Sequence, residues 1–244
     1  MAGDSRALSE VHADDLARAG VIFHDRGFRY RTTGQSLGQG GMGQVYLLER
    51  SAESDGELSE SVVGKTFHSR YLYQLRTDEV TRRDHVTTLN AMARIAALEH
   101  PNLLPTYVAA PIADNYLMVT PLMAETLLEL VTRGGVTPRA RIDLIIQALR
   151  GLQTLHEARV LHRDFTLRNI LVDATWTSAR LFDFDLALSL DDVAGVSYKQ
   201  HYQGRIFGSP GFSVPPEILD PALMECAITQ RMDVFAAGGA LYGL

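Results

Sequence analysis

The chain has 244 residues, of which 46% are hydrophobic and 21% are charged, and its formal net charge is −6. This composition excludes a disordered chain, and the negative charge disfavours nonspecific binding to nucleic acid. A single cysteine, Cys226, excludes an intrachain disulfide and fits a reducing compartment. The N-terminus has no apolar signal core, and the late apolar run at residues 234–244 is too short to span a bilayer. We therefore expect a globular, cytoplasmic protein without a membrane segment.

Strand signals dominate the first part of the chain. Residues 1–27 are polar with weak helical periodicity, and we interpret them as an N-terminal extension or a short surface helix. Strand-like runs follow at residues 28–37, 44–48 and 62–67. The segment 49–61 is rich in Ser, Glu, Asp and Gly, which predicts a long hairpin loop between the last two strands.

The rest of the chain is mainly helical. Residues 78–98 space their apolar side chains for one helix face, and this helix is expected to end before residues 100–102, His-Pro-Asn. A β-rich part followed by a helical part predicts two unlike lobes, with a linker near residues 120–123. Two short strands and two further helices are predicted at residues 107–110, 116–119, 126–132 and 139–158.

Three glycines, Gly38, Gly40 and Gly43, lie between the first two predicted strands. A backbone without Cβ atoms lets N–H groups approach phosphate oxygens closely. A glycine-rich hairpin turn is the alternative, since the pattern is weak without its context. Its place between two strands disfavours a dinucleotide-binding fold.

The most informative string is LHRDFTLRNIL at residues 161–171. Within it, Asp164 can accept a proton from a substrate hydroxyl, and Asn169 offers an amide oxygen to a cation. The downstream Asp183-Phe184-Asp185 adds carboxylates, which suit a hard cation such as Mg²⁺. For any one of these acids a helix cap or a turn is the alternative, but the whole string in this context favours a catalytic loop.

The order and spacing of these motifs resemble the eukaryotic-like protein kinase family. The motifs are the three glycines, Lys65 in Val-Val-Gly-Lys, the string at 161–171, Asp183-Phe184-Asp185 and Pro-Pro-Glu at 215–217. The string Gly-Gly-Met-Gly-Gln-Val-Tyr is similar to that of bacterial serine/threonine kinases. The resemblance runs from about residue 28 to the last residue.

This resemblance implies an α+β, bilobal fold, with an antiparallel sheet plus one helix in the N-lobe and a mainly helical C-lobe. Family members continue beyond the helix in which this sequence stops, so we expect the C-lobe to be incomplete. The expected domains are an N-terminal extension at residues 1–27, a kinase N-lobe at 28–119, a hinge at 120–123 and a C-lobe at 124–244.

The function implied is transfer of the γ-phosphoryl group of Mg²⁺-ATP to a Ser or Thr hydroxyl of a protein substrate, in bacterial signalling. The resemblance assigns catalytic roles to Asp164, Lys65 and Arg168, and Mg²⁺ binding to Asn169 and Asp183. It places ATP between the lobes, with Val119 as the gatekeeper. The residues implied in nucleotide binding are Leu37, Gly38, Gly40, Gly43, Val45, Val63, Lys65, Thr120, Leu122 and Leu171.

Several positions depart from the family pattern. Ala91 takes the place of the glutamate that pairs with the strand lysine, so an Ala91→Glu change is expected to raise activity. Asp185 replaces a glycine, and Val63 replaces a small alanine. These departures favour the alternative of a pseudokinase-like nucleotide-binding or scaffolding module. A small-molecule phosphotransferase is a further alternative, disfavoured by the long activation segment at residues 186–214.

Arg163 implies an anion partner on the activation segment, because a guanidinium pairs well with phosphate. Thr166 and Arg168 follow a tyrosine-kinase arrangement, whereas the segment's end, with Ser209, resembles serine/threonine kinases. Asp233 resembles a structural aspartate below the catalytic loop. The hydroxyls considered for phosphorylation are Ser189, Ser197, Tyr198 and Tyr202, with Ser197 as the first candidate.

Overall fold

The computed structural model describes residues 5–40, 42–54, 60–203 and 214–244. Its backbone divides into two compact units, which we call the sheet unit and the helical unit. The sheet unit comprises Met1–Glu79 and Pro105–Leu122, and the helical unit comprises Val80–Leu104 and Met123–Leu244.

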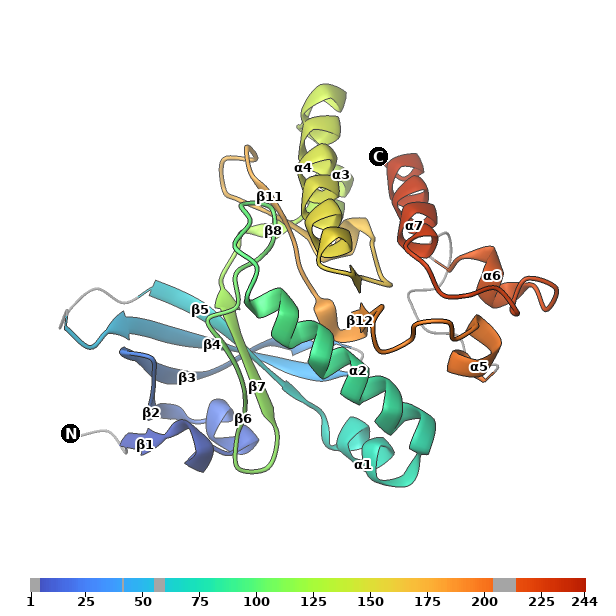
Figure 1. Cartoon of the computed structure of the whole chain (residues 1–244). Helices are drawn as coiled ribbons and strands as arrows, with labels where there is room; N and C mark the ends of the chain where they lie inside the picture. Colours follow the sequence, from blue (N-terminus) through green and yellow to red (C-terminus); the bar gives the residue numbers. More distant parts are fainter. Residues whose placement is uncertain (1–4, 41, 55–59, 204–213) are drawn as a thin grey trace. The chain divides into compact units, whose positions relative to one another are not determined.

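A seven-stranded sheet forms the sheet unit, with its strands in the order β1-β2-β3-β4-β5-β7-β6 (Figure 1). Neighbouring strands are antiparallel, apart from β1 and β2, which are parallel. The strands are β1 Ser5–Ala7, β2 Ala19–Asp25, β3 Phe28–Gln39, β4 Gly43–Ala52, β5 Glu60–Phe67, β6 Val108–Pro111 and β7 Tyr116–Pro121. Two short 3-10 turns, η1 Leu8–Glu10 and η2 Ala13–Ala17, and the helix α1 Ser69–Thr77 complete the unit.

The extension predicted at residues 1–27 pairs with this sheet, and in place of a short surface helix its described residues form β1, two 3-10 turns and β2. Strand β2 pairs with β3, and its side chains alternate, so that Phe23 is fully buried and stacks on Tyr30 with ring centroids 5.1 Å apart. Val11 and Leu16 are also fully buried in the same core. The weak helical periodicity came from two short turns followed by a strand.

The β4–β5 hairpin has longer strands and a shorter loop than the composition predicted. Strand β4 continues to Ala52 and β5 already begins at Glu60. The guanidinium of Arg50 lies between two rings, 3.6 Å from the Phe28 centroid and 3.8 Å from the Tyr107 centroid. Such cation–π contacts stabilise polar residues in a strand, and the composition alone therefore misplaced the strand ends.

The helical unit contains six helices among the described residues and two small sheets. The sheets have the strand orders β11-β10-β8 and β12-β9, and helix α4 lies alongside β11 (Figure 1). The helices are α2 Glu79–Ala96, α3 Leu127–Arg133, α4 Pro138–Glu157, α5 Tyr198–Tyr202, α6 Pro216–Leu219 and α7 Arg231–Tyr242. The strands are β8 Glu125–Thr126, β9 Val160–Leu161, β10 Ile170–Val172, β11 Ala179–Leu181 and β12 Leu188–Ser189, and the 3-10 turns are η3 Leu167–Asn169 and η4 Phe184–Leu186.

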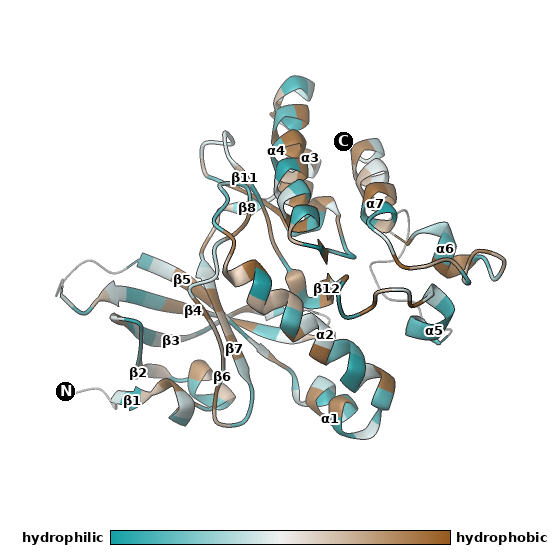
Figure 2. Ribbon diagram, in the orientation of Figure 1, coloured by the Kyte–Doolittle hydropathy of each residue, from teal (hydrophilic) through white to brown (hydrophobic). Residues whose placement is uncertain are grey.

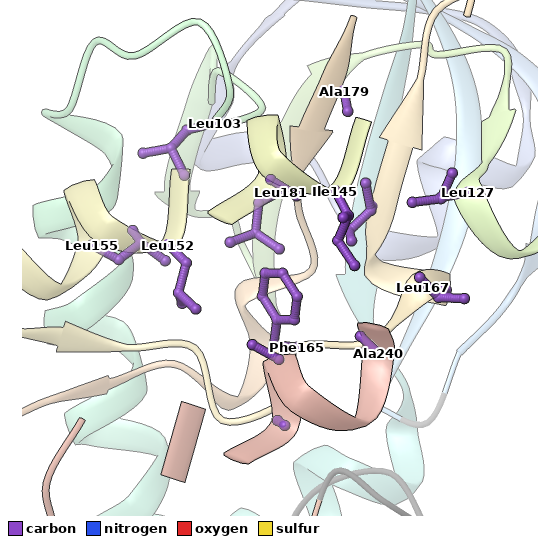
Figure 3. Close-up of a cluster of buried hydrophobic side chains, with 14 of the residues drawn as sticks. Leu103, Leu127, Ile145, Leu152, Leu155, Phe165, Leu167, Ala179, Leu181 and Ala240 are labelled. Carbon is purple, nitrogen blue, oxygen red and sulfur yellow. The ribbon is translucent and has the colours of Figure 1, made fainter. Parts of the chain in front are cut away.

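The core of the helical unit holds the predicted catalytic string in place. Phe165, inside that string, is fully buried and lies next to Leu181 and Ala240 (Figure 3). Helix α4, predicted at residues 139–158, contributes Ile145 and Leu152 to the same core. The backbone on either side of Asp164 is therefore anchored by buried apolar side chains.

Helix α7 is apolar over most of its surface, whereas α4 alternates between hydrophilic and hydrophobic residues (Figure 2). Val234 is 62% exposed and Phe235 is 44% exposed, while Ala236 and Ala237 are buried. In the described part of the chain, we find no helix with the length and hydropathy needed to cross a bilayer.

Candidate active site

The glycine loop connects β3 to β4 and is tied to the end of β5. The Gly40 N–H donates to the Gly43 carbonyl at 2.8 Å, and the His68 N–H donates to the Met42 carbonyl at 3.0 Å. The His68 ring nitrogen Nε2 lies 2.9 Å from the Gly40 carbonyl oxygen. A Cβ added at Gly43 would lie 2.5 Å from the Thr66 carbonyl oxygen, so this glycine also allows β4 to approach β5.

Sheet register places the predicted nucleotide residues of the sheet unit on one face. Val45 lies opposite Lys65 across the β4–β5 pair, and Val63 lies opposite Thr120 across the β5–β7 pair. Directly opposed residues share a face, and so do residues two apart along a strand. These four side chains are half-buried. Gly38 is opposite Val45 in the same row, whereas Leu37 and Leu122 are exposed.

The prediction of Val119 as a gatekeeper beside the nucleotide is not supported by this register. Val119 is opposite Gly64, one residue out of step with Lys65, so its side chain points to the other face of the sheet. It is fully buried there in the core with Leu48 and Leu117. A Cβ at Gly64 would lie 2.7 Å from Leu48 Cδ1, which explains the glycine beside Lys65 as a packing requirement.

The catalytic loop of the helical unit brings Asp164 and Asn169 together. The Asn169 amide nitrogen donates to the Asp164 carboxylate at 2.7 Å and to the Asp164 carbonyl at 2.8 Å. Both donors of this amide therefore point at Asp164, and its oxygen Oδ1 is directed elsewhere. This arrangement fixes the carboxylate relative to the backbone of the loop.

Backbone pairing places Asp183 beside this pair. The Phe182 N–H donates to the Asn169 carbonyl at 3.1 Å. The His162 ring accepts at Nδ1 from the Asp164 N–H at 3.3 Å, and its Nε2 lies 2.9 Å from the Phe182 carbonyl oxygen. These two contacts select the tautomer with the proton on Nε2. His162 is thus the structural link between the catalytic loop and the segment that carries Asp183.

The donor set fits Mg²⁺. Asn169 offers an amide oxygen and Asp183 a carboxylate, and protein sites for Mg²⁺ typically supply one or two carboxylates and leave other positions to water and phosphate. Within the described ranges, no cluster of three or more His, Cys, Asp or Glu residues could form an all-protein metal cage. The two donors are thus compatible with a Mg²⁺ ion whose other positions are filled by water and phosphate.

The replacement of glycine by Asp185 is tolerated in this conformation. The left-handed backbone lies at Asp183, with φ 62°, and not at Asp185. Asp185 is within the 3-10 turn η4, where any residue is accepted, and Phe184 packs against the His162 ring with centroids 5.5 Å apart. The Asp183-Phe184-Asp185 string therefore needs no glycine here.

Asp233 at the start of α7 braces the loop from below, in agreement with its predicted structural role. Its carboxylate is fully buried and accepts from the backbone N–H groups of His162 and Arg163, each at 2.8 Å. His156 Nε2 lies 2.9 Å from the same carboxylate. One side chain thus satisfies two amides at the point where the backbone of Arg163 is left-handed, with φ 63°.

The remaining predicted residues of the helical unit are less constrained. Arg168 is exposed on the turn η3, and Leu171 is half-buried in β10. Thr166 has a buried hydroxyl without a hydrogen-bond partner among the described residues. The structure thus brings Asp164, Asn169 and Asp183 together, while Lys65 belongs to the other unit.

The sequence predicted an anion on the activation segment as the partner of Arg163. In the described structure the anion that pairs with Arg163 lies on α2 instead. Arg163 pairs with Asp84, with nitrogen–oxygen distances of 3.0 and 3.3 Å. The hydroxyls predicted as phosphorylation sites are buried, and Ser197 accepts from the Gln200 N–H as the N-cap of α5. Ser209, on which the resemblance to serine/threonine kinases partly rests, lies outside the described residues. The four buried candidates are Ser189, Ser197, Tyr198 and Tyr202.

Comparison with known proteins agrees with this geometry. A family model described as the protein kinase domain matches residues 31–244. The chain belongs to the protein kinase family. The match covers the glycine loop, the catalytic loop and α7, and the observed sheet and helices are those of a bilobal α+β kinase fold.

Similar protein kinases occur in bacteria and plants. The chain is 27% identical over 210 residues to the serine/threonine-protein kinase pkn2 of Myxococcus xanthus, covering 84% of the chain and 23% of that protein. It is 30% identical over 221 residues to the probable serine/threonine-protein kinase PBL4 of Arabidopsis thaliana, covering 85% of the chain and 48% of that protein. The chain therefore spans less than half the length of these curated relatives.

Two groups of contacts at this site were not predicted from the sequence, although Tyr202 was named there as a phosphorylation candidate. His68 contacts the glycine loop, and Asp84, His201 and Tyr202 surround Arg163. A buried arginine requires an anionic partner. The presence of Arg163 in the catalytic string is therefore the one signal that could have directed attention to the acidic residues of the helix predicted at residues 78–98. It does not specify which acid, because the partners are far apart in sequence.

Proposed function

We propose that the chain is the catalytic domain of an ATP-dependent serine/threonine-protein kinase, which transfers the γ-phosphoryl group of ATP to a protein hydroxyl. The observation that carries the proposal is the pair of hydrogen bonds from Asn169 to Asp164, beside the segment that carries Asp183. The similarity to proteins named as serine/threonine-protein kinases supports serine and threonine as acceptors. A cytoplasmic location is part of the proposal and agrees with a single cysteine, Cys226, which is exposed.

Asp164 is the base in this proposal, because its carboxylate is oriented by Asn169 and can accept the proton of a substrate hydroxyl. Asn169 and Asp183 would hold Mg²⁺, which neutralises charge on the phosphates when it is bound. Lys65 would bind phosphate oxygens, and Arg168 would face the transferring group. Most of the rate gain then comes from positioning and from charge.

Nucleotide binding is proposed for the face of the sheet that carries Lys65. Val45 and Val63 offer apolar contact to a base. The backbone of Thr120 in β7 and of Leu122, which follows β7, is proposed to hydrogen-bond the base, and the Leu122 N–H donates to the Ser61 carbonyl at 3.4 Å in this structure. In the helical unit, Leu171 on β10 is the apolar residue proposed to contact the nucleotide. The remaining nucleotide residues of the proposal are Leu37, Gly38, Gly40 and Gly43.

Phosphotransfer to a mixture of Ser-, Thr- and Tyr-containing peptides tests the proposal. With Mg²⁺-ATP, we expect phosphoserine and phosphothreonine, and Asp164→Asn should lower kcat by roughly 10²- to 10⁴-fold. Asp143→Asn is the matched control, since Asp143 is an exposed acid on α4, and it should leave kcat unchanged. Phosphotyrosine as the sole product would contradict the Ser/Thr assignment.

ATP binding separates a catalytic domain from a binding module. Calorimetry should show ATP binding that depends on Mg²⁺ and that weakens in Asp183→Asn. Binding of ATP by the unchanged chain without phosphotransfer to any peptide would favour the pseudokinase-like alternative. Metal-independent binding that Asp183→Asn leaves unchanged would contradict the metal assignment.

A further inference from the structure

The Arg163 side chain is fully buried, and its guanidinium donates hydrogen bonds in three directions. Nε donates to the Leu186 carbonyl, and Nη1 donates to the Tyr202 hydroxyl at 3.3 Å. The two Nη atoms donate to the two oxygens of Asp84, at 3.0 and 3.3 Å. This two-pronged pairing fixes the plane of the guanidinium as well as its position.

Asp84 remains a carboxylate in this environment. It is 9% exposed, and His201 Nε2 approaches its Oδ1 at 3.2 Å. Burial alone would raise the pKa of the Asp84 carboxyl, but the charge of Arg163 and the hydrogen bonds from His201 and Arg163 hold it well below its usual range. The same pairing raises the pKa of Arg163. Both groups therefore stay charged at neutral pH.

The whole face of α2 around Asp84 contacts the activation segment. Arg83, Asn90 and Arg94 are at positions that repeat along one side of a helix. Arg83 donates to the His201 carbonyl at 2.9 Å, Asn90 donates to Asp192 at 3.0 Å, and Arg94 pairs with Asp191 at 2.7 Å. Residues 191–201 are thus held along this helix by polar contacts, with the Asp84–Arg163 pair buried among them.

Arg163 connects Asp84 to the catalytic loop, in which the next residue is the proposed base, Asp164. Its side chain is held by Asp84, while its backbone N–H donates to Asp233 at 2.8 Å. The backbone between these two anchors is left-handed, with φ 63°, and the next residue is Asp164. A rotation of the Arg163 side chain would therefore displace the peptide that carries Asp164.

We propose that Asp84 is a positioning residue, whose carboxylate supplies the anion for Arg163 and sets the catalytic loop without phosphorylation of the described part of the activation segment. This inference rests on the proposed function. The four candidate hydroxyls of that segment are buried, so the helix acid occupies the place predicted for a phosphate. The position of α2 and the geometry of Asp164 are then coupled through one ion pair.

The test compares four forms of the chain, each treated with phosphatase and shown by mass spectrometry to carry no phosphate. Unphosphorylated wild type should transfer phosphate. Asp84→Asn should lower kcat on the order of 10²-fold, since a misplacement of about 1 Å has such an effect, with the KM for ATP unchanged. Asp84→Glu keeps the charge and should recover part of kcat. Glu79→Gln, an exposed acid on the same helix, is the matched control and should leave kcat unchanged.

Two further measurements distinguish a misplaced catalytic loop from an unfolded Asp84→Asn variant. Asp84→Asn leaves a buried guanidinium without its anion, so we also combine it with Arg163→Met, which removes both charges. The double variant should melt close to wild type and still have the low kcat. Amide hydrogen exchange in Asp84→Asn should show reduced protection at His162 and Arg163, the two amides bound by Asp233.

Two results would overturn the inference: an unchanged kcat in folded Asp84→Asn, or a wild type that becomes active only after phosphorylation. If wild type transfers no phosphate under any condition, the result contradicts the proposed function but not the positioning role of Asp84. Hydrogen exchange still decides the role of Asp84 in that case. Unchanged protection of the loop amides in Asp84→Asn would show that Asp84 does not position the loop.

Discussion

Burial of the Asp84–Arg163 pair makes the stability of the chain depend on pH. Because the folded state lowers the pKa of Asp84, its contribution is present above the ordinary Asp pKa of about 4 and declines as the pH falls below it. Asp84→Asn should lower the free energy of unfolding by about 3–5 kcal/mol at neutral pH. Urea unfolding at pH 7, 5 and 3 should give a similar difference at the first two values and a smaller one at pH 3. A difference that stays constant to pH 3 would contradict the ion pair.

Ala91 shows how the structure changes a prediction made from the family pattern. Its side chain is fully buried in the core of the helical unit, so Ala91→Glu would place a carboxylate among apolar groups. We expect a loss of about 3 kcal/mol or more in stability, and no gain in phosphotransfer. Ala93→Glu, at an exposed position of α2, should be close to neutral. Thermal unfolding of both variants measures this, and a stable, more active Ala91→Glu chain would show that our assignment of the buried face is wrong.

The residues of the catalytic string could be predicted because their relations are local. Asn169 reaches Asp164 across five residues, and His162 reaches it across two, so spacing alone indicates the arrangement. Asp84 could not be assigned in this way, because 79 residues separate it from Arg163. Spacing also cannot reveal that Val119 is out of step with Lys65, since strand register depends on partners elsewhere in the sheet.

Residues 5–25, which form β1, η1, η2 and β2, contribute to the stability of the sheet unit. Leu16 is fully buried, so Leu16→Ala should lower the stability of the sheet unit by about 2–5 kcal/mol. Leu37→Ala, at a position 41% exposed, is the matched control and should change stability by less than about 1 kcal/mol. Chemical denaturation of the two variants measures the difference. Equal, small effects would mean that the segment is dispensable.

At the level of elements, the sequence predicted helices more accurately than strand ends. Helix α4, observed at Pro138–Glu157, lies within one residue of its predicted range of 139–158, and it buries Ile145, Leu152 and Leu155. The ends of β4 and β5 carry Arg50, which is partly buried, and Glu60, which is exposed, and their pairing across the hairpin is not evident from composition. Polar strand residues held by cross-strand partners therefore resemble a loop in the sequence.

The molecule as a whole contains separate cores in its two units. The core around Leu48 draws all its members from the sheet unit, and the core around Phe165 draws all of its members from the helical unit. Because the two units have separate cores, we expect each unit to unfold locally without the other. Native-state hydrogen exchange should show that Leu16→Ala lowers protection first in β2 to β5, whereas Leu144→Ala lowers it first in α4 and β11. Equal loss of protection throughout the chain for both variants would indicate one cooperative unit.

The brace from Asp233 also imposes an order on the maturation of the enzyme. The loop amides that it binds precede it by 70 and 71 residues in the chain. A ribosome therefore releases the catalytic string well before it has made the side chain that fixes it. In a nascent chain that ends before Asp233, the backbone amides of His162 and Arg163 lack the carboxylate that binds them, and the loop acquires this contact only once α7 has been made.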